Sequence, residues 1–246
     1  MTLPHWIEPD WPAPANVRAA ATLRTGGVSE GVFASLNLGS HVGDEPAAVT
    51  ENRRRVITAL GLSSEPLWLN QVHGTAVVEA HPAAAPPTAD AAYTRGANEV
   101  CVVLTADCLP VLFCNRQGTR AAAAHAGWRG LAGGVLSATL AALDAPPHDV
   151  LAWLGPAIEQ DAFEVGAEVR EQFVARDSAN AAAFAPNARG RWQADLYALA
   201  RLELTRSGVK HIHGGGFRCH ADRERFFSYR RDGKTGRMAT MVWLAS

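Results

Sequence analysis

The sequence is poor in lysine and in long apolar runs, and each shortage excludes a class of protein. Lys210 and Lys234 are the only lysines among 23 basic residues, so a Schiff-base or general-base lysine mechanism has few candidates. The most apolar stretch, Val100–Cys114, is too short to span a bilayer and contains Asp107. Charged residues make up 19% of the chain and hydrophobic residues 48%, which excludes a disordered tail and a coiled coil.

The chain also lacks a basic surplus. It has 23 basic and 24 acidic residues and a formal net charge of −1. Because polyanion binders normally carry a basic excess, we expect no nucleic-acid partner. Residues 1–16 show no basic start followed by an apolar run, and four cysteines make a poor disulfide framework for 246 residues. We therefore expect a reduced, cytoplasmic monomer or homodimer without membrane contact.

Helical and strand patterns alternate along the chain without a regular βαβ rhythm. Apolar runs predict buried strands at 99–105, 109–114, 120–126, 150–155 and 239–244. Capping residues and periodicity predict helices at 44–61, with Asp44 as the cap, at 130–143 and at 195–207. Surface loops are predicted at 81–87, 145–147 and 177–191. This order favours one α+β domain over residues 1–246, with helices outside mixed sheets.

Three segments, 70–74, 105–110 and 125–130, place a histidine or cysteine where an apolar run meets glycine or proline. The thiolate of Cys108 and the imidazoles of His73 and His125 form a ligand set that suits zinc or copper. Three protein ligands leave a fourth position for water or substrate, as in a catalytic zinc site. Their separations match no zinc finger, so a buried cysteine and hydrogen-bonded turn histidines remain the alternative reading.

Asp107 is a carboxylate inside a nearly continuous apolar segment. Burying such a group is costly unless it is paired or functional. Asp107 therefore either orients a ligand imidazole, or carries protons, or acts as an ordinary turn aspartate. Cys101 and Cys114 lie inside the predicted strands, and we expect them to be core residues.

The three segments resemble the signature of the bacterial YfiH family, whose members are also called laccase-domain proteins, multicopper-polyphenol-oxidase-like proteins or peptidoglycan editing factor. The likeness extends, in order, through residues 25–29, 35–39, 154–158 and 226–231. The resemblance implies a single four-layer α/β/β/α domain. It also implies a zinc or copper ion held by His73, Cys108 and His125.

The resemblance implies a purine nucleoside enzyme as well. Its reactions would be phosphorolysis of adenosine, inosine or methylthioadenosine to base and ribose 1-phosphate, and deamination of adenosine to inosine. Deamination would require proton transfer, for which Asp107 is the candidate. The sequence has no Cys-x-x-Cys, so the usual zinc-deaminase signature is absent.

Phosphorolysis needs an anion site, and arginine binds phosphate through two parallel hydrogen bonds. The candidate substrate-binding residues within or beside the family segments are Arg24, Asn37, His41, Arg53, Arg129 and Arg230. Surface ion pairs are the alternative for the arginines. Trp128 either stacks on a purine or packs in the core.

Other functions stay open at this point. A laccase with four coppers is disfavoured because the chain has 9 histidines and one His-x-His pair, His211 and His213. A simpler copper-dependent polyphenol oxidase is an alternative. A cysteine hydrolase would use Cys108 as nucleophile and His125 as base, and a metal bound to the sulfur would block it. The last alternative is a non-enzymatic factor in peptidoglycan quality control.

Overall fold

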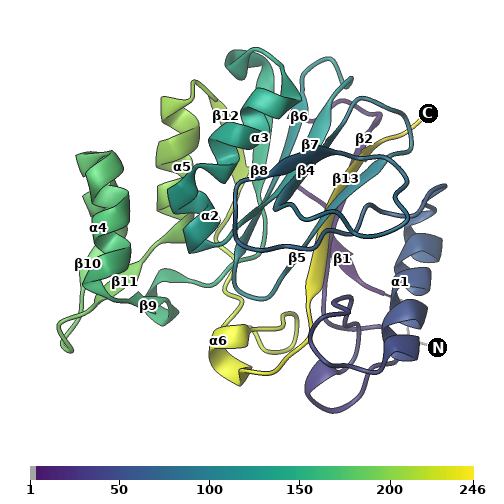
Figure 1. The fold of residues 1–246 in the computed structure, drawn as a ribbon, viewed down its shortest axis with the longest axis horizontal. Helices are drawn as coiled ribbons and strands as arrows, with labels where there is room; N and C mark the ends of the chain where they lie inside the picture. Colours follow the sequence, from purple (N-terminus) through teal and green to yellow (C-terminus); the bar gives the residue numbers. More distant parts are fainter. Residues whose placement is uncertain (1–3) are drawn as a thin grey trace.

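A computed structural model describes residues 4–246, and its strands form three sheets (Figure 1). The sheet orders are β1-β2-β13-β5, β12-β8-β6-β7-β4-β3 and β10-β11-β9. The strands are β1 (Trp6–Ile7), β2 (Val17–Thr22), β3 (Val77–Glu79), β4 (Ala91–Thr94), β5 (Val100–Thr105), β6 (Leu109–Asn115), β7 (Ala121–Ala126), β8 (Val150–Leu154), β9 (Glu164–Val165), β10 (Phe184–Pro186), β11 (Trp192–Ala194), β12 (His211–Gly214) and β13 (Met238–Leu244). The α-helices are α1 (Pro46–Leu60), α2 (Trp128–Gly133), α3 (Val135–Leu143), α4 (Ala167–Arg176), α5 (Leu196–Arg206) and α6 (Tyr229–Asp232).

The strands β5, β6 and β7 are buried along their whole length. Continuous apolar runs such as theirs are typical of strands that are covered on both faces. β5 pairs antiparallel with β13, whereas β6 pairs antiparallel with β7 in the six-stranded sheet. The chain therefore passes from one sheet to the other within residues 106–108.

Of four hydrophobic cores among residues 4–246, three hold these layers together. One packs helices α2 to α5 on the six-stranded sheet, with Leu136 and Leu199 among its buried residues. A second joins the two larger sheets around the fully buried Trp153. A third packs α1 on the four-stranded sheet through Val56, and Figure 1 shows α1 and α3 on opposite sides of the molecule. The mixed α+β class is confirmed, while the four-layer order and the single-domain division stay predictions.

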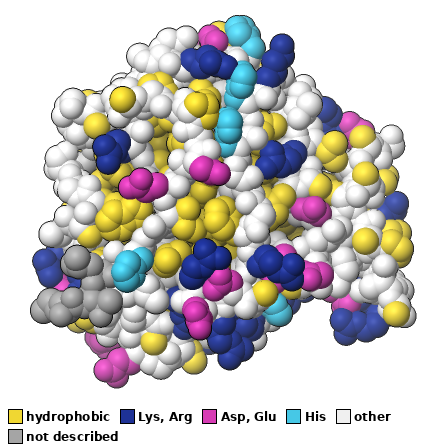
Figure 2. All heavy atoms as spheres, turned by 180° about the vertical axis from the view of Figure 1, so that it is seen from behind, with side chains coloured by type: hydrophobic (Ala, Val, Ile, Leu, Met, Phe, Trp, Pro, Cys, Tyr) yellow, Lys and Arg dark blue, Asp and Glu magenta, His cyan; other side chains and the backbone are white. Residues whose placement is uncertain are grey.

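The surface carries charges of both signs. Figure 2 shows basic and acidic side chains interspersed on one face, around apolar atoms near its centre. Within residues 4–246, no helix combines the length and the apolar character that crossing a bilayer requires.

Two predicted helices differ from those in the structure. The helix predicted at 130–143 is two helices, because Gly134 adopts a φ of 96° between α2 and α3. The cap predicted at Asp44 is wrong: Glu45 occupies the N-cap, and Asp44 instead accepts hydrogen bonds from Ser29 Oγ at 2.6 Å and Asn37 Nδ2 at 2.9 Å. These bonds tie the start of α1 to the preceding loop.

The loop predicted at 177–191 is also wrong in part. It contains a 3-10 helix, Ser178–Ala183, whose first turn is capped by the side chain of Asp177, and then β10. The strands predicted at 99–105, 109–114, 120–126, 150–155 and 239–244 are confirmed to within one residue at each end.

Candidate functional site

The three residues predicted as metal ligands lie together at one end of the six-stranded sheet. His125 is near the end of β7, Cys108 immediately precedes β6, and His73 lies in the loop before β3. The register that pairs Leu109 with Ala126 brings Cys108 next to this end of β7. One ligand atom from each residue lies within 4.8 Å of the others, and Cys108 Sγ is 3.9 Å from His73 Nε2.

Asp90, which precedes β4, orients two of these ligands. Its carboxylate is fully buried and accepts a hydrogen bond from His125 Nδ1 at 2.9 Å. It also accepts the backbone N–H groups of Val72, His73 and Gly74 at 3.2, 2.9 and 2.6 Å. These bonds hold His73 in the left-handed region, with a φ of 60°. Because Nδ1 of His125 donates to Asp90, the lone pair of Nε2 is left for a metal.

Opposite charges stabilise each other in the cluster. Burial raises the pKa of the Cys108 thiol, but the charges and hydrogen bonds of His125 and His73 outweigh it and lower the pKa to about 6. Burial lowers the pKa of His125, but the Cys108 thiolate and the Asp90 carboxylate reverse this effect and raise it to about 9. In the metal-free cluster, each group therefore favours the charged form of the other, thiolate at Cys108 and imidazolium at His125.

The cluster also fits a metal ion by shape and donor chemistry. Cysteine thiolate and histidine imidazole are both usual zinc ligands, and the ligand atoms of a tetrahedral zinc site stand about 3.5 Å apart. Gly127 leaves the space beside them open, since a Cβ there would lie 2.9 Å from Cys108 Sγ and 3.0 Å from His73 Cδ2. Both observations support a metal centre held by His73, Cys108 and His125.

A cavity of about 520 Å³ opens over the cluster. This volume is in the range of sites for small organic molecules. Asp107 is the one acidic residue among the described residues that line it, whereas its basic residues include three arginines. The lining residues are His41, Gln71, His73, Leu104, Thr105, Ala106, Asp107, Cys108, His125, Trp128, Arg129, Ile158, Phe163, Leu196, Tyr229, Arg230 and Arg237.

Four of the predicted catalytic and substrate-binding residues line this cavity: Asp107, His41, Arg129 and Arg230. The exposed Arg129 lies over the ring of Trp128, with its guanidinium carbon 4.5 Å from the ring centroid. Arg230 is also exposed, and its Nη1 donates to the Glu164 carbonyl at 3.0 Å. The structure thus brings these side chains to the same cavity as the metal cluster.

The other two predicted arginines do not line the cavity. Arg24 donates from Nε and Nη2 to the Ala34 carbonyl at 3.0 and 2.7 Å. Arg53 donates to the Leu38 carbonyl at 3.1 and 2.9 Å and lies over the ring of Trp68. Both guanidinium groups therefore hold the backbone on either side of residues 35–37.

Asn37 does not line the cavity either, because its side chain is fully buried. Its Oδ1 accepts the backbone N–H groups of Gly39 and Arg237, both at 2.9 Å. Its Nδ2 donates to the Asp44 carboxylate at 2.9 Å. Asn37 thus joins the loop before α1 to the start of β13.

Asp107 stands in the turn between β5 and β6 with a φ of 92°. Its Oδ2 accepts the backbone N–H of Arg230 at 2.6 Å, while its buried Oδ1 has no partner among the described residues. Burial raises the pKa of this carboxyl, although the hydrogen bonds of Arg230 and Ser228 oppose the shift. Of the three alternatives for Asp107, the first, orienting a ligand imidazole, falls to Asp90, which binds His125.

Sequence reasoning missed several residues of the site. Asp90 and Arg237 have no local sequence signal, because each lies outside the segments that resemble the family. Gln71 lies inside one of those segments, and its amide clamps β5 by bonds to the N–H and carbonyl of Leu104. Tyr229 is 61% exposed at the cavity wall.

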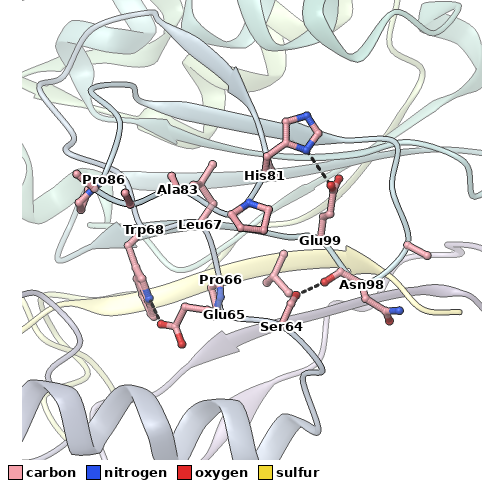
Figure 3. A pocket seen from close by; sticks show the side chains of 16 residues that line it. Ser64, Glu65, Pro66, Leu67, Trp68, His81, Ala83, Pro86, Asn98 and Glu99 are labelled. Atoms are coloured by element: carbon pink, nitrogen blue, oxygen red, sulfur yellow. Dashed lines mark hydrogen bonds and ion pairs between the residues drawn. The ribbon is translucent and has the colours of Figure 1, made fainter.

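A second cavity, of about 380 Å³, shares no lining residue with the first (Figure 3). Its walls are mostly alanine, proline and the indole of Trp68, whose Nε1 donates to Glu65 at 2.6 Å. At its rim, His81 Nδ1 lies 2.9 Å from a Glu99 carboxylate oxygen. Within residues 4–246, the only His, Cys, Asp and Glu cluster suited to a metal lies in the first cavity.

The fold and the site together define a mixed α+β protein in which a His/Cys/His cluster suited to a metal ion lines a cavity that also holds three arginines. The chain belongs to the family described as multi-copper polyphenol oxidoreductase laccase, whose family model matches residues 18–245. This assignment and the relatives below confirm the resemblance to YfiH proteins.

Two relatives and one solved structure show how close the likeness is. The chain is 56% identical over 240 residues to a Pseudomonas aeruginosa protein named purine nucleoside phosphorylase, covering 97% of this chain and 98% of the relative. It is 52% identical to Escherichia coli purine nucleoside phosphorylase YfiH, with the same coverage of both chains. A Neisseria meningitidis crystal structure superposes with a TM-score of 0.95 at 53% identity, covering 98% of this chain and 99% of that one.

Proposed function

We propose that this protein is a metal-dependent purine nucleoside phosphorylase. Its reaction would convert adenosine, inosine or methylthioadenosine and phosphate into the free base and ribose 1-phosphate. The observation that carries the proposal is the cavity itself, where the His/Cys/His cluster faces three arginines, Arg129, Arg230 and Arg237. Among residues 4–246, none of the three forms an ion pair with a carboxylate within 4.0 Å. This uncompensated positive charge suits an anionic co-substrate.

The proposed metal is zinc, with copper as the alternative. His73, Cys108 and His125 would hold it, and Asp90 would keep His125 oriented. When bound, zinc would supply a Lewis acid that stabilises negative charge developing in the cavity. The sulfur of Cys108 would then be a ligand and unavailable as a nucleophile, which separates this proposal from a cysteine hydrolase.

Asp107 is the residue that we assign to proton transfer. In phosphorolysis the bond from the base nitrogen to C1′ of the sugar breaks, a phosphate oxygen bonds to C1′, and the base leaves with a proton. A general acid next to the leaving base lowers the barrier of this step. The buried Oδ1 of Asp107 has no other partner among the described residues, and burial favours its protonated form. Its N–H donor, Arg230, fixes the carboxyl plane.

The remaining predicted residues would bind the substrates. We assign His41, Arg129 and Arg230 to direct contact, because all three line the cavity. Trp128 lines it too, and its ring would stack on the purine. Arg24, Asn37 and Arg53 would act through the backbone that they hold.

Neither adenosine deamination nor phenol oxidation by copper has an observation of its own in the described residues. His211 and His213 lie on β12 outside the cluster, and His211 Nε2 is 2.6 Å from Arg116 Nη2. Methionine sulfur can serve as a weak copper ligand. The sulfur of Met238 instead accepts the backbone N–H of Phe227 at 3.0 Å. We propose that the activity is cytoplasmic, where nucleosides and phosphate are both available.

The test is to incubate zinc-loaded protein with adenosine, with and without phosphate. We expect adenine and ribose 1-phosphate only when phosphate is present. Cys108→Ala should remove both the metal and the activity, whereas the matched Cys114→Ala, in the core of β6, should retain them. Appearance of inosine alone would replace phosphorolysis by deamination, and oxidation of phenols that follows copper content would point to the laccase alternative. Absence of the expected products with zinc or copper would overturn the proposal.

A further inference from the structure

Arg237 differs from the other arginines of the cavity in how firmly it is held. It lies immediately before β13, and its Nη1 donates to the carbonyls of Thr235 and Gly236 at 2.9 and 3.0 Å. Its backbone N–H is bound by Asn37 Oδ1 at 2.9 Å. The side-chain stem passes over Gly39, where a Cβ would lie 2.8 Å from Arg237 Cγ. The guanidinium is therefore fixed before any ligand arrives.

The free edge of this guanidinium has no protein partner. Nε and Nη2 of Arg237 form no hydrogen bond with any residue from 4 to 246, and no carboxylate lies within 4.0 Å. These two donors form the edge that binds an oxyanion through two parallel hydrogen bonds. Arg237 is half-buried, and these N–H donors have no acceptor in the protein. An anion bound at this edge would therefore stabilise the guanidinium.

The position of Arg237 connects that edge with the metal cluster. Arg237 lines the same cavity as Cys108 and Asp107. Burial lowers the pKa of Arg237, while the negative charges of these two groups oppose the shift. All three arginines lie over aromatic rings, Arg129 over Trp128, Arg230 over Phe163 and Arg237 over Tyr229, but Arg129 and Arg230 are exposed whereas Arg237 is half-buried. Those two arginines are placed to attract an anion at the cavity wall, whereas Arg237 is placed to hold it.

We propose that Arg237 anchors the phosphate co-substrate through its Nε–Nη2 edge. The inference rests on the proposed function for the identity of the anion, and it assigns to one residue the task of binding and orienting it. Phosphate held there would lie in the same cavity as the metal cluster and Asp107. Arg129 and Arg230 then contact the substrates and add positive charge at the cavity wall, which raises the local phosphate concentration, while Arg237 sets the orientation of the phosphate.

The test measures phosphate and nucleoside kinetics separately in Arg237→Gln and Arg237→Lys. We expect Arg237→Gln to raise the KM for phosphate about 30-fold and to change the KM for nucleoside less than about threefold, because two charge-assisted hydrogen bonds are lost. Arg237→Lys keeps the charge but not the fork, so its phosphate KM should rise about 5- to 10-fold. The control Arg54→Gln, on the exposed face of α1, should leave both constants unchanged.

A second measurement does not depend on activity. Titration calorimetry of inorganic phosphate into metal-free protein should show binding that Arg237→Gln abolishes and Arg54→Gln keeps. If the protein does not phosphorolyse nucleosides but this binding pattern holds, the proposed function fails and the anion site stands. If phosphorolysis occurs and Arg237→Gln has an unchanged phosphate KM, or raises only the nucleoside KM, the inference is overturned. Thermal unfolding and zinc content show that each variant is folded and metal-loaded. If Arg237→Gln does not fold, the phosphate KM of Arg237→Lys decides the inference.

Discussion

The carboxylate of Asp90 binds the Nδ1 of His125 at 2.9 Å and, at the same time, three consecutive backbone N–H groups of the loop that carries His73. One buried side chain thus fixes both the tautomer of one ligand and the position of another. Partners of this kind make a metal ligand more basic and hold its ring in place. The candidate metal centre therefore depends on a residue outside its set of ligands.

Replacing Asp90 tests this dependence. Asp90→Asn should lower zinc affinity about 10- to 100-fold, because the carboxylate that orients His125 is lost. It should also lower the free energy of unfolding by about 3 kcal/mol, because an amide cannot accept all four hydrogen bonds. Competition with a zinc chelator and thermal unfolding measure the two effects. Asp161→Asn, at a carboxylate that is 68% exposed, is the control and should change neither; wild-type zinc affinity in Asp90→Asn would contradict the prediction.

Cys108 should be the reactive thiol of the metal-free protein. Its pKa is lowered to about 6, so the thiolate predominates above that pH and is lost below it. Burial raises the pKa of the other three thiols, Cys101, Cys114 and Cys219, and shields them. The rate of alkylation by iodoacetamide, followed by mass spectrometry, should show one fast site with a midpoint near pH 6. His125→Ala should move that midpoint upward, zinc should protect the site, and a wild-type midpoint near pH 9 would refute the assignment.

Gly127 should be required for metal binding more than for folding. In Gly127→Ala the new Cβ would meet Cys108 Sγ at 2.9 Å, so the ligands must move apart. We expect zinc affinity to fall by about tenfold or more, as for other changes that displace a ligand-supporting group. Gly190→Ala serves for comparison, since it strains a residue with a φ of 70° but has open space around it. That variant should lose some thermal stability and keep its full zinc content.

Asp107→Asn should separate metal binding from catalysis. Asparagine tolerates the left-handed conformation at this position and can still accept the Arg230 N–H, but it cannot transfer a proton. We expect kcat to fall about 100-fold or more with zinc content unchanged. Steady-state rates and metal analysis on the same preparation check this. A variant with wild-type kcat would remove Asp107 from the proton-transfer step.

The parts of the site that follow a local sequence pattern could be predicted from the sequence. The apolar runs of β5 and β6 predict buried strands, and the short segments around His73, Cys108 and His125 predict the ligands through their resemblance to a known family. Spacing alone could not bring these residues together, because their proximity depends on the pairing of β6 with β7.

Residues whose role comes only from tertiary contact could not be predicted in the same way. Asp90 stands between two alanines in a polar-to-apolar transition that looks like an ordinary strand entry. Arg237 stands in a glycine-containing turn, where an exposed arginine is the normal expectation. Conversely, Arg24 and Arg53 are predicted to bind substrate, but the carbonyls of Ala34 and Leu38 take up their donors. An arginine is free to bind a ligand only where the folded chain does not already supply acceptors for its N–H groups.

The pairing of β6 with β7 gives the ligand cluster a further property. Cys108 immediately precedes β6 and His125 lies on β7, so both are positioned by neighbouring strands of the six-stranded sheet. A slip of one residue between these strands is about 3.3 Å, which is larger than any metal–ligand bond can absorb. The affinity for the proposed metal would therefore report the register of the two strands. Substitutions around Trp153, which pairs with Leu112 of β6, should change that affinity without contacting the ion.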